Sequence, residues 1–163
     1  MRLINGAAST NFWIDLGALE GEALPIYGRG ENVRDWLFVE DHARALRRVF
    51  EAGTPGETYN IGGNSERRNI DVVRTICAAL DARHPRADGQ SYAEQITFVA
   101  DRPGHDQRYA IDAAKIAREL GWTPQVRFED GIAATVDWYL TRKDWWEPIL
   151  QRRYATERLG LKS

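Results

Sequence analysis

Cysteine is almost absent from this sequence, which has one, Cys77, in 163 residues. A single cysteine cannot form a disulfide within the chain, and a free thiol suits a reducing compartment such as the cytoplasm. Cys77 lies at helical spacing from Ile70, Val73 and Leu80. We therefore predict that it packs in the core of the protein.

Long hydrophobic runs and a strong net charge are also missing. No apolar stretch approaches the ~20 residues that a membrane span requires, and the first residues lack the apolar run of a signal peptide. The formal net charge of −2 gives no general attraction to nucleic acid or to an anionic membrane. We expect a soluble cytoplasmic protein with neither of these partners, in which any anion site is built from a few placed arginines.

The residue patterns of metal and nucleophile sites are absent as well. The three histidines are scattered and have no cysteine or carboxylate neighbours at metal-ligand spacing. No serine or cysteine lies in a nucleophile elbow. Neither Gly28-Arg29-Gly30 nor Gly62-Gly63 has the third glycine and the following helix of a dinucleotide-binding loop. The residues therefore predict no metal site and no cofactor-binding loop.

One match to a catalytic pattern is a decoy. Tyr139 and Lys143 have the Y-x-x-x-K spacing of the catalytic pair in short-chain dehydrogenases, and this spacing places both on one helix face. However, Tyr139 continues the apolar stripe of Ile132 and Val136. We interpret Tyr139 as a packing residue and predict no catalytic residue in the chain.

Strand patterns alternate with helical patterns along the chain, which predicts an α/β or α+β fold. Asn69 and Asp112 are predicted to cap helices at their N-termini, and Gly121 to end a helix in the left-handed conformation. Strands are expected at residues 24–27, 33–39, 58–61 and 96–99. Helices are expected at residues 40–51, 69–83, 112–120 and 130–142, with a further short one within 11–23.

The candidate binding residues lie in short loops and at strand ends. A guanidinium at Arg34, after the glycine-rich turn, suits phosphate oxygens, and Pro25 with Tyr27 offers a flat wall for a base. The loop 101–106 supplies Arg102 and His105 as further donors. The carboxamide of Asn60, at the end of its expected strand, both donates and accepts. Spacing alone leaves an ordinary surface or packing role open for each of these residues.

Four longer strings resemble a known family. In order and without large gaps, they are LPIYGRGENVRDWLFVEDHARAL, GETYNIGG, ITFVADRPGHDQRYAIDAAKIARELGWTP and FEDGIAATVDWYL. Together they closely resemble the second half of dTDP-glucose 4,6-dehydratases, which are extended short-chain dehydrogenase/reductases. The resemblance covers about Ala18 to Trp146, and DRPGHDQRYAID is its most discriminating string.

The resemblance implies a fold and a set of site residues. It implies the C-terminal substrate-binding part of an extended short-chain dehydrogenase/reductase, with a few elements that normally complete the Rossmann domain. Residues 18–163 would form this nucleotide-sugar-binding portion. By their matching positions, Pro25 and Tyr27 would lie near the thymine, Arg34 at the diphosphate, and Asn60, Arg102 and His105 around the nucleotide.

The resemblance also implies what is missing. In the family, the NAD-binding loop and the acid–base and Tyr/Lys catalytic residues precede the matched region. Residues 1–17 are atypical of what should stand there, which suggests a truncation or a frameshift. We expect NAD in the full-length family enzyme and none in this chain alone. Expected partners are dTDP-glucose or dTDP, bound weakly, and a separate N-terminal half. The family is homodimeric.

Two other interpretations remain open from the sequence. The chain resembles, more distantly, UDP-sugar epimerases and decarboxylases of the same superfamily. It is also compatible with a non-enzymatic remnant or binding module. A preference for dTDP over UDP would separate the first of these from the dehydratase interpretation.

Overall fold

The fold was analysed in a computed structural model, which describes residue 19 and residues 21–147. The expected segment 1–17, most of the short helix expected within 11–23, and the chain after residue 147 lie outside the described residues. The elements follow the order β1 (Leu24–Tyr27), β2 (Val33–Asp35), α1 (Val39–Ala52), β3 (Glu66–Arg68), α2 (Asn69–Arg83), η2 (Tyr92–Gln95), β4 (Ile96–Val99), α3 (Ala114–Leu120) and α4 (Phe128–Thr141).

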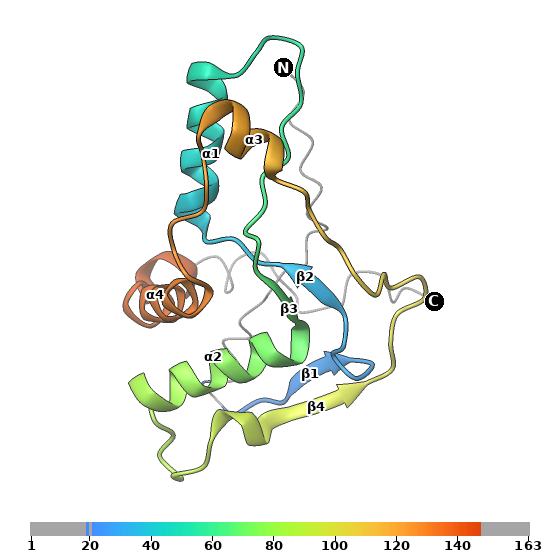
Figure 1. Ribbon diagram of the computed structural model, residues 1–163. Coiled ribbons are helices and arrows are strands. Elements are labelled where there is room, and N and C mark those ends of the chain that lie inside the picture. Colours follow the sequence, from blue (N-terminus) through green and yellow to red (C-terminus); the bar gives the residue numbers. More distant parts are fainter. Residues whose placement is uncertain (1–18, 20, 148–163) are drawn as a thin grey trace.

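The strands form two small sheets rather than one doubly wound sheet. β1 and β4 pair in parallel, with Leu24 aligned to Ile96 and Tyr27 to Val99. β2 and β3 pair antiparallel. In Figure 1, α2 lies above β1 and β4 at the base, and α1 and α3 stand side by side at the top. The mixture of helices and short strands is the partial α/β fold expected of the matched family region.

The core is divided between the two ends of the molecule. The upper cluster joins α1 to α3 and buries Ala45, Val49, Ala113, Ile116, Leu120 and Trp122. The lower cluster joins α2, η2 and α4 and buries Cys77, Leu80, Tyr92 and Val136. The core position predicted for Cys77 is thus confirmed, and burial raises the pKa of its thiol to about 11.

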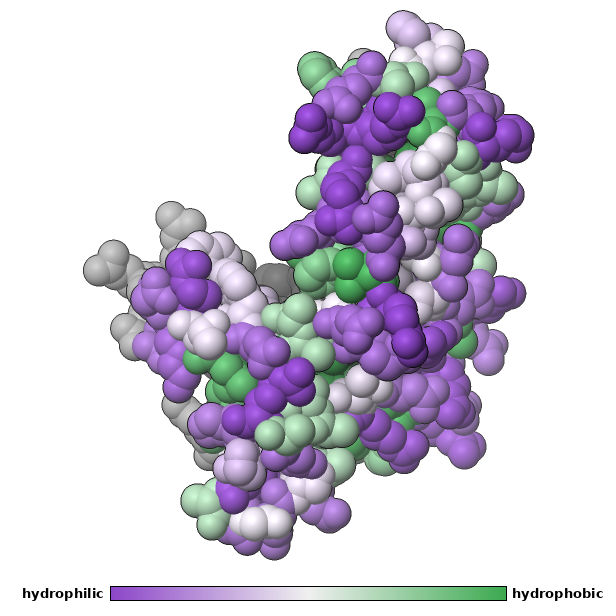
Figure 2. Space-filling view, turned by 60° about the vertical axis from the view of Figure 1, so that its left-hand side comes forward, coloured by the Kyte–Doolittle hydropathy of each residue, from purple (hydrophilic) through white to green (hydrophobic). Residues whose placement is uncertain are grey.

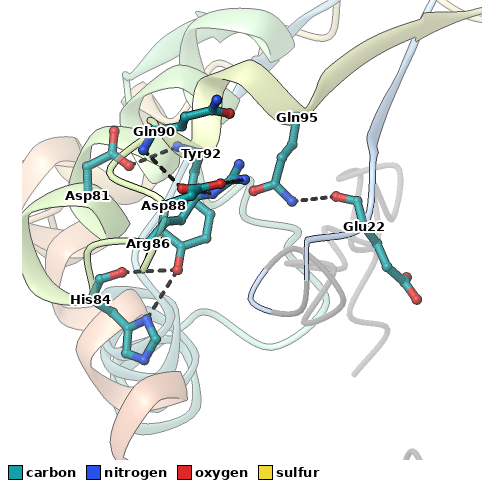
Figure 3. Close-up of polar contacts among 8 residues, drawn as sticks. All are labelled: Glu22, Asp81, His84, Arg86, Asp88, Gln90, Tyr92 and Gln95. Carbon is teal, nitrogen blue, oxygen red and sulfur yellow. Dashed lines mark hydrogen bonds and ion pairs between the residues drawn. The ribbon is translucent and has the colours of Figure 1, made fainter.

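Polar contacts hold η2 and the start of β1 in place. Tyr92 is buried, and its hydroxyl donates to the carbonyl of His84 at 3.0 Å. Its backbone N–H donates to the carboxylate of Asp81 at 2.9 Å. The side chain of Gln95 donates to the carbonyl of Glu22 at 2.6 Å, which ties the segment before β1 to the segment before β4 (Figure 3).

Two of the predicted strands need correction. The strand expected over 33–39 ends at Asp35, and Val39 already begins α1. The segment 58–61 is not a strand, although Tyr59 and Ile61 pack against the upper core cluster. Its alternating pattern is that of a half-buried strand, but no strand within residues 21–147 pairs with it, and an extended segment becomes a strand only by pairing.

The start of α2 also differs from the prediction. Arg68 occupies the N-cap position and Asn69 is the first helical residue, so Asn69 does not cap this helix. The residues before it form β3, a charged Glu-Arg-Arg strand that the sequence pattern did not predict. Pairing with β2 places these residues in a strand despite their low strand propensity.

Of the two predicted caps of α3, Gly121 agrees with the structure, whereas the N-cap position is occupied by Ala113 and Asp112 precedes it. The Asp112 carboxylate accepts a hydrogen bond of 2.9 Å from the N–H of Ala114, at the start of the helix. Gly121 ends the helix with a φ of 65°, and its N–H donates to the carbonyl of Ala117. α3 therefore begins at Ala114, two residues later than predicted, and ends where Gly121 was expected to end it.

Most of the surface in Figure 2 is hydrophilic, with small hydrophobic patches between polar side chains. The largest exposed apolar side chain on α1 is Phe50, which is 82% exposed. In the part of the chain that the structure describes, no helix is long and apolar enough to cross a membrane.

Candidate functional site

The candidate site lies where β1 and β4 end. Because these strands are parallel, the turn after Tyr27 and the loop after Val99 leave the same edge of the sheet. The N–H of Gly28 donates to the carbonyl of Val99 at 2.9 Å, which holds the turn against the loop. The carboxyl ends of parallel strands are where α/β proteins commonly bind ligands.

Tyr27 and Pro25 point to the same side of β1. Both are exposed, whereas Ile26 between them is buried. The ring of Tyr27 meets the imidazole of His105 edge to face, with centroids 6.3 Å apart and planes at 83°. Pro25 and Tyr27 therefore form an open strand face with His105 at one end, and its contact with a base stays a prediction.

His105 is fixed by the carboxylate of Asp101. Its Nδ1 donates to Oδ1 of Asp101 at 2.6 Å, and the side chain of His105 is only 6% exposed. The hydrogen bond from His105, helped by the backbone N–H and the charge of Arg102, lowers the pKa of the Asp101 carboxyl. This ionised carboxylate orients the imidazole and the backbone of Arg102 within the loop.

Arg34 occupies an unusual position for an arginine. It is 5% exposed, and its guanidinium donates to the carbonyls of Val33 at 2.7 Å and Asp106 at 2.9 Å. Its Nε is buried without a hydrogen-bond partner among the described residues. The described residues form no ion pair with Arg34, so it is a buried cation whose fixed partners are neutral carbonyls.

The structure brings Arg34 and the loop 101–106 together, but it places Asn60 elsewhere. The side chain of Asn60 is exposed and donates to the carbonyl of Asp112 at 3.3 Å, near the start of α3. Its nucleotide-binding role stays a prediction, as do the roles assigned to the other five residues.

Asn69 is a site candidate that the sequence analysis missed. Its backbone N–H donates to the carbonyl of Asn32 at 3.0 Å, which places it beside the turn that leads into β2. Its side-chain Oδ1 is buried, with no partner in the described part of the chain. A buried acceptor without a partner at the start of α2 suits a ligand that offers a donor. The pattern had suggested a helix cap, so it gave no signal for this role.

The described residues do not fit a dinucleotide cofactor. The turn containing Gly28 and Gly30 joins β1 to β2 and does not lead from a strand into a helix. Gly62 and Gly63 follow segment 58–61, which pairs with no strand among the described residues, and lead to β3. Between residues 21 and 147, no group of three or more His, Cys, Asp or Glu side chains is placed to hold a metal ion.

The Tyr139–Lys143 pair is also poorly placed for catalysis. α4 ends at Thr141, so the helix does not continue from Tyr139 to Lys143. The Tyr139 ring packs edge to face on Trp138, with centroids 5.0 Å apart. Its carbonyl accepts a hydrogen bond of 2.8 Å from the indole of Trp146. These contacts agree with a packing role for Tyr139.

Comparison with known proteins shows the family of this chain. The model of the family described as GDP-mannose 4,6 dehydratase matches residues 14–135. The chain belongs to this family. Within it, the chain is 59% identical over 143 residues to a dTDP-glucose 4,6-dehydratase from Xanthomonas campestris, covering 88% of this chain and 41% of that protein. It is 64% identical over 141 residues to a dTDP-glucose 4,6-dehydratase from Salmonella typhimurium, covering 86% and 38%.

Solved structures of this family agree with the sequence matches. A dTDP-glucose 4,6-dehydratase from Streptomyces venezuelae, with NAD and thymidine diphosphate bound, has a TM-score of 0.72 and 42% identity, covering 82% of this chain and 39% of that one. A UDP-glucuronic acid 4-epimerase from Bacillus cereus has a TM-score of 0.60 and 27% identity, covering 75% and 36%. The chain thus spans about two fifths of its relatives and is more similar to the dehydratases.

Proposed function

We propose that this chain is the dTDP-sugar-binding part of a dTDP-glucose 4,6-dehydratase, formed by residues 18–163. The full enzyme would convert dTDP-glucose to dTDP-4-keto-6-deoxyglucose with NAD. The observation that carries the proposal is Arg34, a buried guanidinium with no ion-pair partner among the described residues. Burying a charge is costly unless it is paired, and a nucleoside diphosphate would supply the missing negative charge.

The roles of the other residues follow from their placement. Tyr27 and Pro25 would line one side of the thymine, and His105, whose Nδ1 donates to Asp101, would present its Nε2 to the nucleotide from the loop. Arg102 would add a second positive charge toward the diphosphate. Asn69, with its buried and unpartnered Oδ1, supplements Asn60 as a carboxamide candidate.

Titration calorimetry with dTDP tests the anion site. We expect Arg34→Ala to weaken binding by roughly 1.5–3 kcal/mol, the contribution of a hydrogen bond to a charged group. Arg47→Ala is the matched control, because Arg47 is exposed on α1 and pairs with Glu51. Equal affinity of the Arg34→Ala variant and the wild type would remove Arg34 from the site. Tighter binding of UDP than of dTDP would favour the epimerase or decarboxylase alternative.

We further propose that the chain alone neither retains NAD nor turns over dTDP-glucose, because these 163 residues lack the glycine-rich cofactor loop. Incubation of the purified chain with NAD and dTDP-glucose should give no 4-keto sugar. If product forms and Tyr139→Phe abolishes it, Tyr139 is catalytic and the proposal is wrong.

A separate polypeptide with the N-terminal half of the enzyme would be the partner that completes the activity. The exposed Phe50 on α1 and the unpaired segment 58–61 are the surfaces that such a partner would cover. The cytoplasmic location remains a prediction from the single cysteine. Co-expression with the N-terminal half of a relative should restore 4-keto sugar formation, and failure of two soluble halves to associate would contradict this partner.

A further inference from the structure

Tyr109 lies beneath the buried arginine of the proposed site. The Arg34 Cζ is 4.6 Å from the centroid of the Tyr109 ring, in cation–π geometry. A guanidinium has five N–H donors, and carbonyl acceptors take two of those on Arg34. The ring supports the charged group without using a donor, so the remaining N–H groups are left for a ligand.

Tyr109 is held at both its backbone and its hydroxyl. Its N–H donates to the carbonyl of Val33 at 3.0 Å, and Val33 and Arg108 form a parallel bridge. Its hydroxyl donates to the carboxylate of Asp106. The carbonyl of that same Asp106 accepts from Arg34. Tyr109 and Asp106 therefore both contact the guanidinium of Arg34 and are joined to each other by a hydrogen bond.

The second arginine of the site also acts on Tyr109. The hydrogen bond to Asp106 raises the pKa of the Tyr109 phenol, whereas the charges of Arg34 and Arg102 both oppose this rise. Arg34, on β2, contacts the ring directly, and the charge of Arg102, in the loop after β4, also acts on the phenol.

We propose that Tyr109 is a positioning residue for nucleoside diphosphate binding, which holds the Arg34 guanidinium flat and joins it to the loop of Arg102 through Asp106. The inference rests on the proposed function, since it takes the diphosphate as the ligand of the two arginines. Tyr109 itself needs no contact with the ligand.

Calorimetry of the full chain with dTDP and with thymidine tests the proposal. Tyr109→Leu should weaken dTDP binding about tenfold, within the range of a desolvated cation–π contact, and should leave thymidine binding unchanged. Tyr109→Phe retains the ring but loses the hydrogen bond to Asp106, so its loss of affinity should be smaller, within about threefold of the wild type. In an Arg34→Ala background, Tyr109→Leu should have no further effect. A full tenfold loss in that background would show that Tyr109 does not act through Arg34 and would overturn the proposal.

Different results would contradict the proposed function and the proposed role of Tyr109. If Arg34→Ala leaves dTDP affinity unchanged, the proposed function fails. If Arg34→Ala weakens binding and Tyr109→Leu does not, only the role of Tyr109 fails. A measurement without ligand tests the proposal even if dTDP binds too weakly for calorimetry. The NMR signal of the Arg34 Nε–H is assigned by its loss in Arg34→Ala. Its chemical shift should change in Tyr109→Leu and stay the same in Tyr109→Phe. An unmoved signal in Tyr109→Leu would overturn the proposal.

Discussion

The buried carboxylate of Asp41 accepts a hydrogen bond of 2.9 Å from the backbone N–H of Val126, 85 positions further along the chain. The other carboxylate oxygen accepts from Gln125 at 3.1 Å and pairs with Arg44. Asp41, in the first turn of α1, also suits the helix dipole. The structure shows in addition that it anchors the segment between α3 and α4.

Asp41→Asn should lower the free energy of unfolding by about 1.5–3 kcal/mol, because a carboxamide has one acceptor oxygen for two backbone donors and loses the charge. Urea unfolding followed by circular dichroism measures the change. Asp88→Asn is the control, since Asp88 is exposed and pairs locally with Arg86, and it should cost much less. Equal losses in both variants would show that Asp41 is not an anchor.

The same carboxylate should make stability depend on pH. Burial alone would raise the pKa of Asp41, but hydrogen bonds from Val126 and Gln125 and the charge of Arg44 outweigh burial and lower it. The stabilisation is therefore present above the unfolded value of about 3.9 and is lost as the pH falls through the lower folded pKa. The difference between wild type and Asp41→Asn in urea should shrink from pH 6 to pH 3. A constant difference would contradict this.

Gly63 should not tolerate a side chain. A Cβ at this position would lie 2.0 Å from the carbonyl oxygen of Trp36, and the N–H of Gly63 donates to Asp35 at 2.7 Å. Gly63→Ala should therefore separate this segment from β2 and lower the melting temperature. Gly89→Ala is the control: it has open space but a φ of 73°, so it should cost only about 1 kcal/mol. Similar melting temperatures for the two variants would contradict the close approach.

Phe50 should promote self-association without contributing to stability. Since it is 82% exposed, Phe50→Ser should change the free energy of unfolding by less than about 0.5 kcal/mol and reduce association in light scattering. Val49→Ala, at the adjacent buried position, should lose roughly 2 kcal/mol. If Phe50→Ser self-associates as much as the wild type, the Phe50 side chain does not cause the association.

Elements with a clear pattern were predicted well, and elements that depend on a distant partner were not. The apolar stripes of α1 and α4 and the short runs of β1 and β4 are visible in the sequence. β3 is charged and becomes a strand only by pairing with β2, whereas residues 58–61 have a strand pattern but no strand to pair with among the described residues.

The candidate site shows the same limit. The chemistry of Arg34 could be inferred from its residue type and its place after a glycine-rich turn. The groups that hold the Arg34 guanidinium could not be inferred, because Tyr109 and the carbonyl of Asp106 come from a loop more than 70 positions away in the sequence. Asn69 was mistaken for a cap because an amide before an apolar helix usually has that role, and only the structure reveals its unpartnered oxygen.

The parallel pairing of β1 with β4 has a consequence for folding order. Leu24 is aligned with Ile96, so during synthesis β1 leaves the ribosome long before its partner exists. Contacts between residues this far apart form slowly, because a large loop must close first. β1 therefore remains unpaired, with Ile26 exposed to solvent, while the chain from β2 to η2 is synthesised. In a cell, this interval is when a chaperone would be most useful to the chain.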